Sequence, residues 1–373
     1  MNLNELVALS NKYGANPDFV LAGGGNTSYK ENNVMAVKAS GYALSSIDED
    51  GFVMMDTGRL LKMMEADYPD DDKGREACAL KDMMDARLDG SGENRPSVEC
   101  ILHALFPQKY VLHLHPALVN GITCGKNGET SAKQIFEDIK ETYLWVPLIK
   151  PGYILSKTCA KLFSDHDAFY GKYPAIVLLQ NHGIFVAADE TDEIDRIIEE
   201  VVSRINKKII RKPALTESAL VSPESIDAKN AAIINLEKLT GGSIIFLSNK
   251  EITAFTESFD TYSPISKPFT PDHIVYCNAY PLFIESVDDI NTAFEAYVTA
   301  YNREPKIVVI EKLGVFALGK DENKAIMASE LYLDTVKIAV YSESFGGPLT
   351  LPDDFTDFIV NWESESYRQK KSS

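Results

Sequence analysis

The sequence predicts an α/β protein organised in two parts, and three observations support this prediction. Strand-like apolar runs such as Ala175–Leu179 occur together with long amphipathic helical patterns such as Glu190–Ile210. The length of 373 residues exceeds the roughly 100 to 200 residues of one typical domain. A segment rich in Pro, Ser, Thr and Glu, Arg211–Ser225, is the best candidate for a domain boundary.

Local patterns predict the N-terminal elements. Apolar residues at helical spacing predict a first helix over Asn4–Tyr13. The short apolar run Phe19–Ala22 then leads into the glycine-rich loop Gly23–Ser28, and Val34–Val37 is again extended in character. We therefore expect a strand, a glycine loop, a turn and a second strand in this region.

The middle of the chain alternates between polar and amphipathic segments. Glu65–Gly74 is mostly polar and predicts a solvated loop, whereas Glu76–Arg87 has a helical pattern. Pro96 stands where a helix can begin, because its fixed φ suits the first helical position and apolar residues follow at helical spacing. Tyr110–His115 has the composition of a strand.

A weak internal repeat links the two halves. The segment Ile176–Phe185 can be laid on Ile307–Phe316 so that Ile, Val, Gly and Phe coincide, and both copies lead into a helix. In this register Leu313 replaces His182. The alternative is that any two strand–turn–helix units share such a pattern.

Composition excludes several classes of partner. Fifty-five acidic against 37 basic side chains give a formal charge of −18, which repels nucleic acid and anionic lipid surfaces alike. We expect no nucleic-acid or membrane partner. The chain has no apolar run near the ~20 residues that span a bilayer and no signal-like N-terminus, so we expect a cytoplasmic protein. The five cysteines form no Cys-x-x-Cys pair, and we expect them to be small core residues.

The strongest chemical signal is the pair His113 and His115. Alternate side chains of a strand share one face, so two imidazoles at i and i+2 can bind one metal ion. His182 follows the apolar run Ala175–Leu179 and is a candidate third ligand, with Gly183 allowing the chain to turn. The alternative is that all three are core histidines that donate to backbone carbonyls.

Glu99 and His103 lie four residues apart and therefore share one face of the predicted helix. A carboxylate in a first helical turn can simply interact with the helix dipole. The functional alternative is a proton-transfer group beside the metal. His103 could orient Glu99 or bridge the helix to a strand, and we favour the bridge.

The loop Gly23–Ser28 could cradle a phosphate through backbone N–H groups, an amide and hydroxyls. It nearly matches a dinucleotide-binding fingerprint. That fingerprint requires a helix directly after the loop to meet the pyrophosphate, and no amphipathic helix follows here. We therefore reject a dinucleotide-binding fold.

Taken together, five separated signatures resemble the class II aldolase/adducin family in the same order along the chain. They are Gly-Gly-Asn26-Thr-Ser28, Ser40-Gly41, Pro96-Ser97-x-Glu99-x-x-x-His103, His113-x-His115-Pro116 and Asn181-His182-Gly183. The resemblance covers roughly Leu3 to Ile210. It is closest to the aldolase part of bifunctional rhamnulose-1-phosphate aldolase/short-chain dehydrogenase proteins, whose dehydrogenase domain we expect to be absent here.

The resemblance implies a three-layer α/β/α fold with one divalent metal ion per active site, Zn²⁺, bound by His113, His115 and His182. It also implies that Glu99 is the catalytic acid/base. Residues that match the family's substrate-phosphate positions are Gly25, Asn26, Thr27, Ser28, Ser40, Gly41 and Ser97. Val98 departs from the two successive serines of some members, and the tyrosine that handles the aldehyde-side hydroxyl has only two candidates here, Tyr143 and Tyr153.

The implied function is a metal-dependent lyase of carbohydrate catabolism, acting as a homo-oligomer. It would cleave a ketose 1-phosphate, such as rhamnulose 1-phosphate or fuculose 1-phosphate, to dihydroxyacetone phosphate and lactaldehyde. Alternatives are a sugar-phosphate epimerase, dehydratase or decarboxylase of the same family, or a non-catalytic adducin-like binding module. We expect a catalytic domain over residues 1–212 and a degenerate aldolase-like repeat without metal ligands over residues 224–373.

Overall fold

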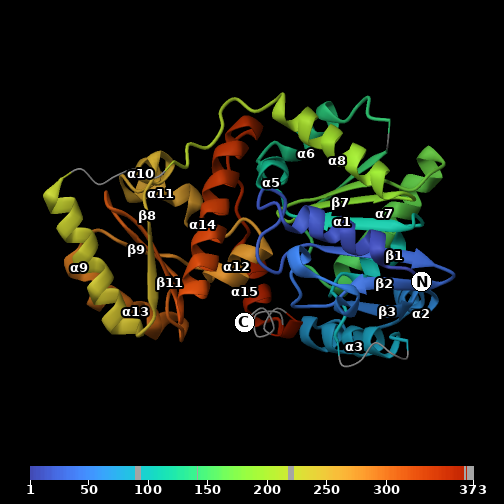
Figure 1. Cartoon of the computed structure of the whole chain (residues 1–373), viewed down its shortest axis with the longest axis horizontal. Helices are drawn as coiled ribbons and strands as arrows, with labels where there is room; N and C mark the ends of the chain where they lie inside the picture. Colours follow the sequence, from blue (N-terminus) through green and yellow to red (C-terminus); the bar gives the residue numbers. More distant parts are fainter. Residues whose placement is uncertain (89–93, 141, 217–221, 365–366, 368–373) are drawn as a thin grey trace. The chain divides into compact units, whose positions relative to one another are not determined.

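The computed structural model describes residues 1–88, 94–140, 142–216, 222–364 and 367, which form two units (Figure 1). The first unit comprises Met1–Thr123, Gly128–Lys208 and the chain from Trp362, and the second comprises Cys124–Asn127 and Ile209–Asn361. The predicted boundary segment Arg211–Ser225 lies partly outside the described residues. The domain limits 1–212 and 224–373 therefore stay a prediction.

A seven-stranded sheet forms the centre of the first unit, in the order β3-β2-β1-β4-β7-β6-β5. Neighbouring strands are antiparallel except for β5 and β6, which are parallel. The strands are β1 (Asn26–Glu31), β2 (Val34–Lys38), β3 (Phe52–Asp56), β4 (Tyr110–Leu114), β5 (Tyr143–Val146), β6 (Ile176–Leu179) and β7 (Gly183–Ala188).

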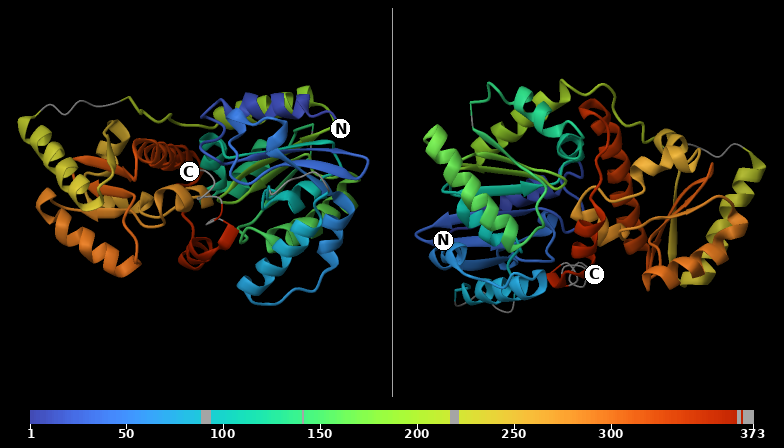
Figure 2. Two further views of the ribbon diagram at one scale, coloured as in Figure 1. Left: turned by 60° about the horizontal axis from the view of Figure 1, so that its bottom comes forward. Right: turned by 180° about the vertical axis from the view of Figure 1, so that it is seen from behind.

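Helices cover both faces of this sheet, and Figure 2 shows α1 and α8 on the side opposite α3 and α7. The helices are α1 (Asn4–Gly14), α2 (Thr57–Lys62), α3 (Asp72–Asp85), α4 (Cys100–Leu105), α5 (Ala117–Thr123), α6 (Gly128–Ile135), α7 (Tyr153–Tyr170) and α8 (Thr191–Asn206). Tyr13 Oη of α1 donates to Asp195 of α8 at 2.8 Å, which ties the two helices of one layer together. The predicted three-layer α/β/α fold is confirmed.

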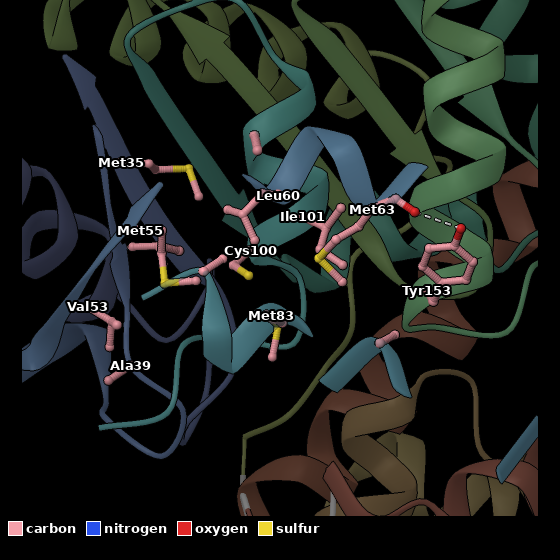
Figure 3. Close-up of a cluster of buried hydrophobic side chains, with 14 residues drawn as sticks. Met35, Ala39, Val53, Met55, Leu60, Met63, Met83, Cys100, Ile101 and Tyr153 are labelled. Atoms are coloured by element: carbon pink, nitrogen blue, oxygen red, sulfur yellow. Dashed lines mark hydrogen bonds between the residues drawn. The ribbon is translucent and has the colours of Figure 1, made fainter. Parts of the chain in front are cut away.

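Helix α4 is short but is held between two hydrophobic clusters. Ile101 packs with Met35 and Met55 in the first cluster, shown in Figure 3. Leu102 packs with Val111 and other residues in the second cluster. Because consecutive side chains of α4 are buried in different clusters, the helix has little freedom to rotate or shift on the sheet.

Several predicted elements are confirmed, with boundaries shifted by a few residues. The first helix is α1, the strand after Pro107 is β4, and the long amphipathic helix is α8. The predicted helix over Glu76–Arg87 is α3, which starts earlier, at Asp72.

Two local predictions are wrong. Phe19–Ala22 is not a strand but a series of turns, in which Ala22 has a φ of 50°, and the first strand begins only at Asn26. The helix expected at Pro96 begins at Cys100 instead. Here the backbone pairs with the end of β2, since Ser97 N donates to Lys38 O at 2.9 Å, and an extended segment cannot also be helical.

The cysteines follow the prediction in part. Cys100, Cys124, Cys159 and Cys277 are buried, as expected of small core residues. Cys78 is exposed on α3, so the prediction is wrong for this residue.

The second unit contains a four-stranded mixed sheet in the order β8-β11-β10-β9. Its strands are β8 (Ser243–Leu247), β9 (Leu282–Ile284), β10 (Ile307–Ile310) and β11 (Gly314–Gly319). Its helices are α9 (Pro223–Thr240), α10 (Lys250–Phe255), α11 (Phe259–Tyr262), α12 (Pro271–Cys277), α13 (Ile290–Tyr301), α14 (Glu322–Ser342) and α15 (Asp353–Asn361).

This sheet repeats the order and directions of β4-β7-β6-β5 in the first unit. In each sheet the first two pairs are antiparallel and the last pair is parallel. Helix α13 follows β9 as α7 follows β5, and helix α14 follows β11 as α8 follows β7. Across the described residues, every helix is too short or too polar to cross a membrane.

Candidate metal centre

Three histidines converge at one end of the first sheet. His113 lies on β4, His115 follows that strand directly, and His182 lies in the turn between β6 and β7. One ring nitrogen from each lies within 4.8 Å of the others. The Nε2 atoms of His113 and His115 are 2.8 Å apart, so the two rings point at a common position. This triad could hold a metal ion.

The donor chemistry of His113 fits a metal ligand. Its Nδ1 lies 3.0 Å from the carbonyl oxygen of Ile184, which can only accept a hydrogen bond. Nδ1 therefore carries the proton, and Nε2 presents its lone pair towards His115. Burial lowers the pKa of His113 well below its usual value, which keeps the imidazole in the neutral form that binds metal.

The pairing of β4 with β7 brings His182 to the other two histidines. Gly183 lies so close to β4 that a Cβ there would come within 2.4 Å of Leu114 O and 2.8 Å of His115 Cδ2. The left-handed residue of the turn is Asn181, with a φ of 55°. The prediction that Gly183 serves the turn is therefore wrong. It allows the close approach of two strands.

Glu99 faces the histidines from the N-terminus of α4. Its Oε2 lies 3.4 Å from His113 Nε2 and its Oε1 lies 3.4 Å from His182 Nε2. Oε1 is buried and accepts no hydrogen bond from the described residues. Burial alone would raise the pKa of Glu99, but the pKa is lowered overall, and the hydrogen bond from the Asn26 amide is a cause that needs no charged imidazole.

Several of the predicted phosphate-binding residues gather beside Glu99. Asn26 Nδ2 donates to Glu99 Oε2 at 2.7 Å and to Ser97 Oγ at 3.1 Å. Ser40 lies next to this segment because its N donates to Arg95 O at 2.8 Å. The glycines fit their backbone: Gly41 has a φ of 90°, and a Cβ on Gly25 would lie 2.7 Å from His113 O.

The side chains of Thr27 and Ser28 are directed elsewhere. Thr27 lies on the opposite face of β1 from Asn26, where its Oγ1 is 2.7 Å from Ser10 Oγ of α1. Ser28 Oγ is 2.7 Å from His103 Nδ1. Both side chains are fully buried in these contacts, so these two residues are not brought to a ligand position by their hydroxyls.

Neither tyrosine candidate lies beside the histidines. Tyr153 is a core residue whose hydroxyl donates to Met63 O at 2.9 Å, as Figure 3 shows. Tyr143 lies on β5, which is separated from β4 by β6 and β7. The structure therefore places neither of these two candidates at the histidine site.

Sequence reasoning missed the environment of Arg95, which precedes the Pro96-Ser97 motif. Its buried guanidinium donates to both carboxylate oxygens of Glu363, at 3.0 and 2.9 Å, and to Ser364 Oγ at 2.8 Å. These partners lie more than 260 positions away in the sequence. No local pattern could have indicated the contact.

The second unit has other residue types at the equivalent positions. His113 pairs with Phe185 across β4 and β7, and Phe246 pairs with Phe316 across β8 and β11. This register places Phe246 at the position of His113, Ser248 at that of His115, and Leu313 at that of His182. Because phenylalanine and leucine carry no ligand atom, the equivalent position cannot hold a metal in the same way.

The chain is similar in sequence to known proteins. A sequence profile described as "Class II Aldolase and Adducin N-terminal domain" matches residues 4–204. A protein of Bacillus subtilis (strain 168), named as the uncharacterized oxidoreductase YuxG, is 24% identical over 98% of this chain. The chain spans 58% of the length of that relative.

Two solved structures align with the first part of the chain. The N-terminal class II aldolase domain of a conserved protein from Thermoplasma acidophilum is 28% identical, with a TM-score of 0.47, and the match covers 56% of this chain and 93% of that one. L-fuculose 1-phosphate aldolase from Glaciozyma antarctica PI12 is 12% identical, with a TM-score of 0.36, over 64% and 90% of the two chains. Since the profile matches more than half of its residues, the chain belongs to the class II aldolase and adducin family.

Proposed function

We propose that this chain is a zinc-dependent aldolase. Its substrate would be a ketose 1-phosphate, such as rhamnulose 1-phosphate or fuculose 1-phosphate, cleaved to dihydroxyacetone phosphate and lactaldehyde. The observation that carries the proposal is the convergence of three histidine nitrogens with the Glu99 carboxylate 3.4 Å from two of the rings. Membership of the class II aldolase and adducin family supports it.

His113, His115 and His182 would hold the metal. Three protein ligands are the usual number at a catalytic zinc site, which leaves a position for the substrate, and here all three would be histidines. When bound, the ion would supply the positive charge that stabilises the enediolate formed as the carbon–carbon bond breaks. The buried, unpartnered Oε1 of Glu99 fits a cation next to it.

Glu99 would move the proton. Its lowered pKa keeps it ionised at neutral pH, so it can accept the proton of the substrate hydroxyl that becomes the aldehyde. The electrons of the breaking bond pass into the substrate carbonyl and give an enediolate. Glu99 then returns the proton to the enediolate carbon and is ionised again, which balances the cycle with one carboxyl group.

Ser40, Gly41 and Ser97 would hold the substrate phosphate, with the Asn26 amide beside them. The chain carries a formal charge of −18, so long-range attraction does not favour an anionic substrate. Binding must come from local hydroxyl and N–H donors. These contacts would fix the reacting carbons relative to Glu99 and use binding energy for alignment.

Product analysis tests the proposal. The zinc-loaded chain should release dihydroxyacetone phosphate and an aldehyde in equal amounts from one member of a panel of deoxyketose 1-phosphates. Removal of the metal by a chelator should stop the release, and added Zn²⁺ should restore it. An epimerase, dehydratase or decarboxylase would give other products. If His113→Ala and His115→Ala leave the metal content unchanged, the proposed site is wrong.

A further inference from the structure

A chain of buried hydrogen bonds runs from β1 through α4 to the candidate acid/base. His103 Nδ1 lies 2.7 Å from Ser28 Oγ, and His103 Nε2 is bonded to Asn26 Oδ1. Asn26 Nδ2 continues the chain to Glu99 Oε2 at 2.7 Å. His103 is fully buried, and Asn26 and Glu99 are 5% and 7% exposed. Water therefore has little access to compete for these bonds.

The direction of each hydrogen bond follows from its acceptors. The ionised Glu99 carboxylate can only accept, so the Asn26 nitrogen must face it and the Asn26 oxygen must face His103. That oxygen needs a donor, which is the Nε2–H of the imidazole. Nδ1 then keeps its lone pair and accepts from the Ser28 hydroxyl. Burial lowers the pKa of His103 to about 3, so the ring is neutral at physiological pH.

A purely structural role would not need the bond to Asn26. The Ser28 contact already joins α4 to β1 through Nδ1. Lys30 of β1 gives a second link, since its Nζ donates to the carbonyl oxygens of His103 at 2.8 Å and Phe106 at 2.7 Å. The bond from Nε2 to Asn26 adds something different. It gives the Asn26 oxygen a donor, and so supports the amide orientation in which the Asn26 nitrogen faces Glu99 and Ser97.

We propose that His103 is a positioning residue, whose Nε2–H sets the orientation of the Asn26 amide and thereby holds the Glu99 carboxylate for proton transfer. This inference rests on the proposed function in that it takes Glu99 as the proton-transfer group. Without the Nε2–H, the amide of Asn26 can turn over. Its oxygen then faces the Glu99 carboxylate and repels it from its position.

Two substitutions separate positioning from packing. His103→Gln places an amide N–H near the former Nε2 and can still donate to Asn26. His103→Asn has a polar group only near the former Nδ1, so it can reach Ser28 but not Asn26. Both variants lose the ring and its packing, which makes them a matched pair.

The kinetic result should differ between the two variants. His103→Asn should lower kcat by roughly tenfold to a hundredfold, with a smaller change in KM, because misplacement of a reacting group costs rate more than binding. His103→Gln should recover most of that loss. Equal kcat values in the two variants would overturn the proposal.

Lys30→Met is the control for the structural link. It removes two hydrogen bonds between β1 and α4 without touching Nε2 of His103. It should lower the midpoint of thermal unfolding and leave kcat close to that of the unsubstituted chain. A loss of kcat equal to that of His103→Asn would show that the helix–strand link matters instead, and would contradict the proposal.

A readout that does not depend on activity keeps this inference separate from the proposed function. In the full chain with ¹⁵N-labelled histidine, NMR should find His103 as the neutral Nε2–H tautomer, both without metal and with Zn²⁺. The Nδ1–H tautomer would overturn the proposal. If no ketose phosphate is cleaved but the tautomer is Nε2–H and a neutron crystal structure of His103→Asn, which locates the amide hydrogens, has the Asn26 amide reversed, the proposed function fails and the positioning role stands.

Discussion

Gly183→Ala tests whether the approach of β7 to β4 builds the histidine site. The new Cβ would lie 2.4 Å from Leu114 O and 2.8 Å from His115 Cδ2, both closer than the 3.0 Å that real Cβ atoms keep. The strands must therefore separate by at least about 0.6 Å at this point, in a well-packed region that cannot easily yield. His115 lies at the end of β4 and His182 directly precedes β7, so the two histidines would move apart as the strands separate.

The expected magnitude comes from two effects. Overpacking a rigid site costs about 1 to 3 kcal/mol, which lowers the unfolding midpoint of a unit of about 200 residues by roughly 2 to 12 °C. Displacing two metal ligands by a fraction of an ångström should weaken Zn²⁺ binding by about 10- to 100-fold, as changes in supporting residues do at other metal sites.

Calorimetric Zn²⁺ titration and thermal unfolding measure both effects in the same samples. Gly58→Ala is the matched control. Gly58 lies in α2, and a Cβ there meets only the Asp56 side chain at 3.3 Å. The control should bind Zn²⁺ like the unsubstituted chain. If Gly183→Ala also binds Zn²⁺ with unchanged affinity and unfolds at the same temperature, the close approach does not build the site.

Three further predictions concern pH, the Arg95 contact and metal stoichiometry. Folding lowers the pKa of His103 from 6.5 to about 3, so between these pH values the imidazole is protonated in the unfolded chain but not in the folded one. The free energy of unfolding is therefore retained above pH 6.5 and falls by up to roughly 5 kcal/mol towards pH 3. Urea unfolding at several pH values should give a shallower loss for His103→Gln. Glu363→Gln should destabilise the first unit by about 1 kcal/mol, because the buried Arg95 loses the charge of a partner that is itself 66% exposed, whereas Asp138→Asn at the surface should leave the unfolding midpoint unchanged. The chain should bind one Zn²⁺ and not two, since the second unit has Phe246, Ser248 and Leu313 at the equivalent positions; two equivalents at similar affinity would contradict that assignment.

Alternation along a strand was enough to predict that His113 and His115 share a face. The 2.8 Å separation of their Nε2 atoms confirms this prediction. The approach of His182 could not be derived in the same way, because it depends on the hydrogen-bonded register between β4 and β7. Only the resemblance to a known family connected the three histidines before the structure did.

The start of α4 was mispredicted for a similar reason. Pro96 favours a helix start by its own geometry, but Ser97 and Ser40 take part in backbone pairing with distant residues. The interpretation of His103 as a bridge between helix and strand is confirmed by its contact with Ser28. The second hydrogen bond of His103, to Asn26, connects residues 77 positions apart. It could be identified only from the folded structure.

The most direct test of the central claim is the rate of carbon–carbon cleavage by Glu99→Gln at equal zinc content. Single-turnover release of dihydroxyacetone phosphate from the best ketose 1-phosphate should fall by at least about 100-fold, because the amide cannot carry the proton. The zinc content per chain should stay as in the unsubstituted protein, since the three histidines are intact. Cleavage by Glu99→Gln at the unsubstituted rate, or no cleavage of any ketose 1-phosphate by the zinc-loaded chain, would contradict the account.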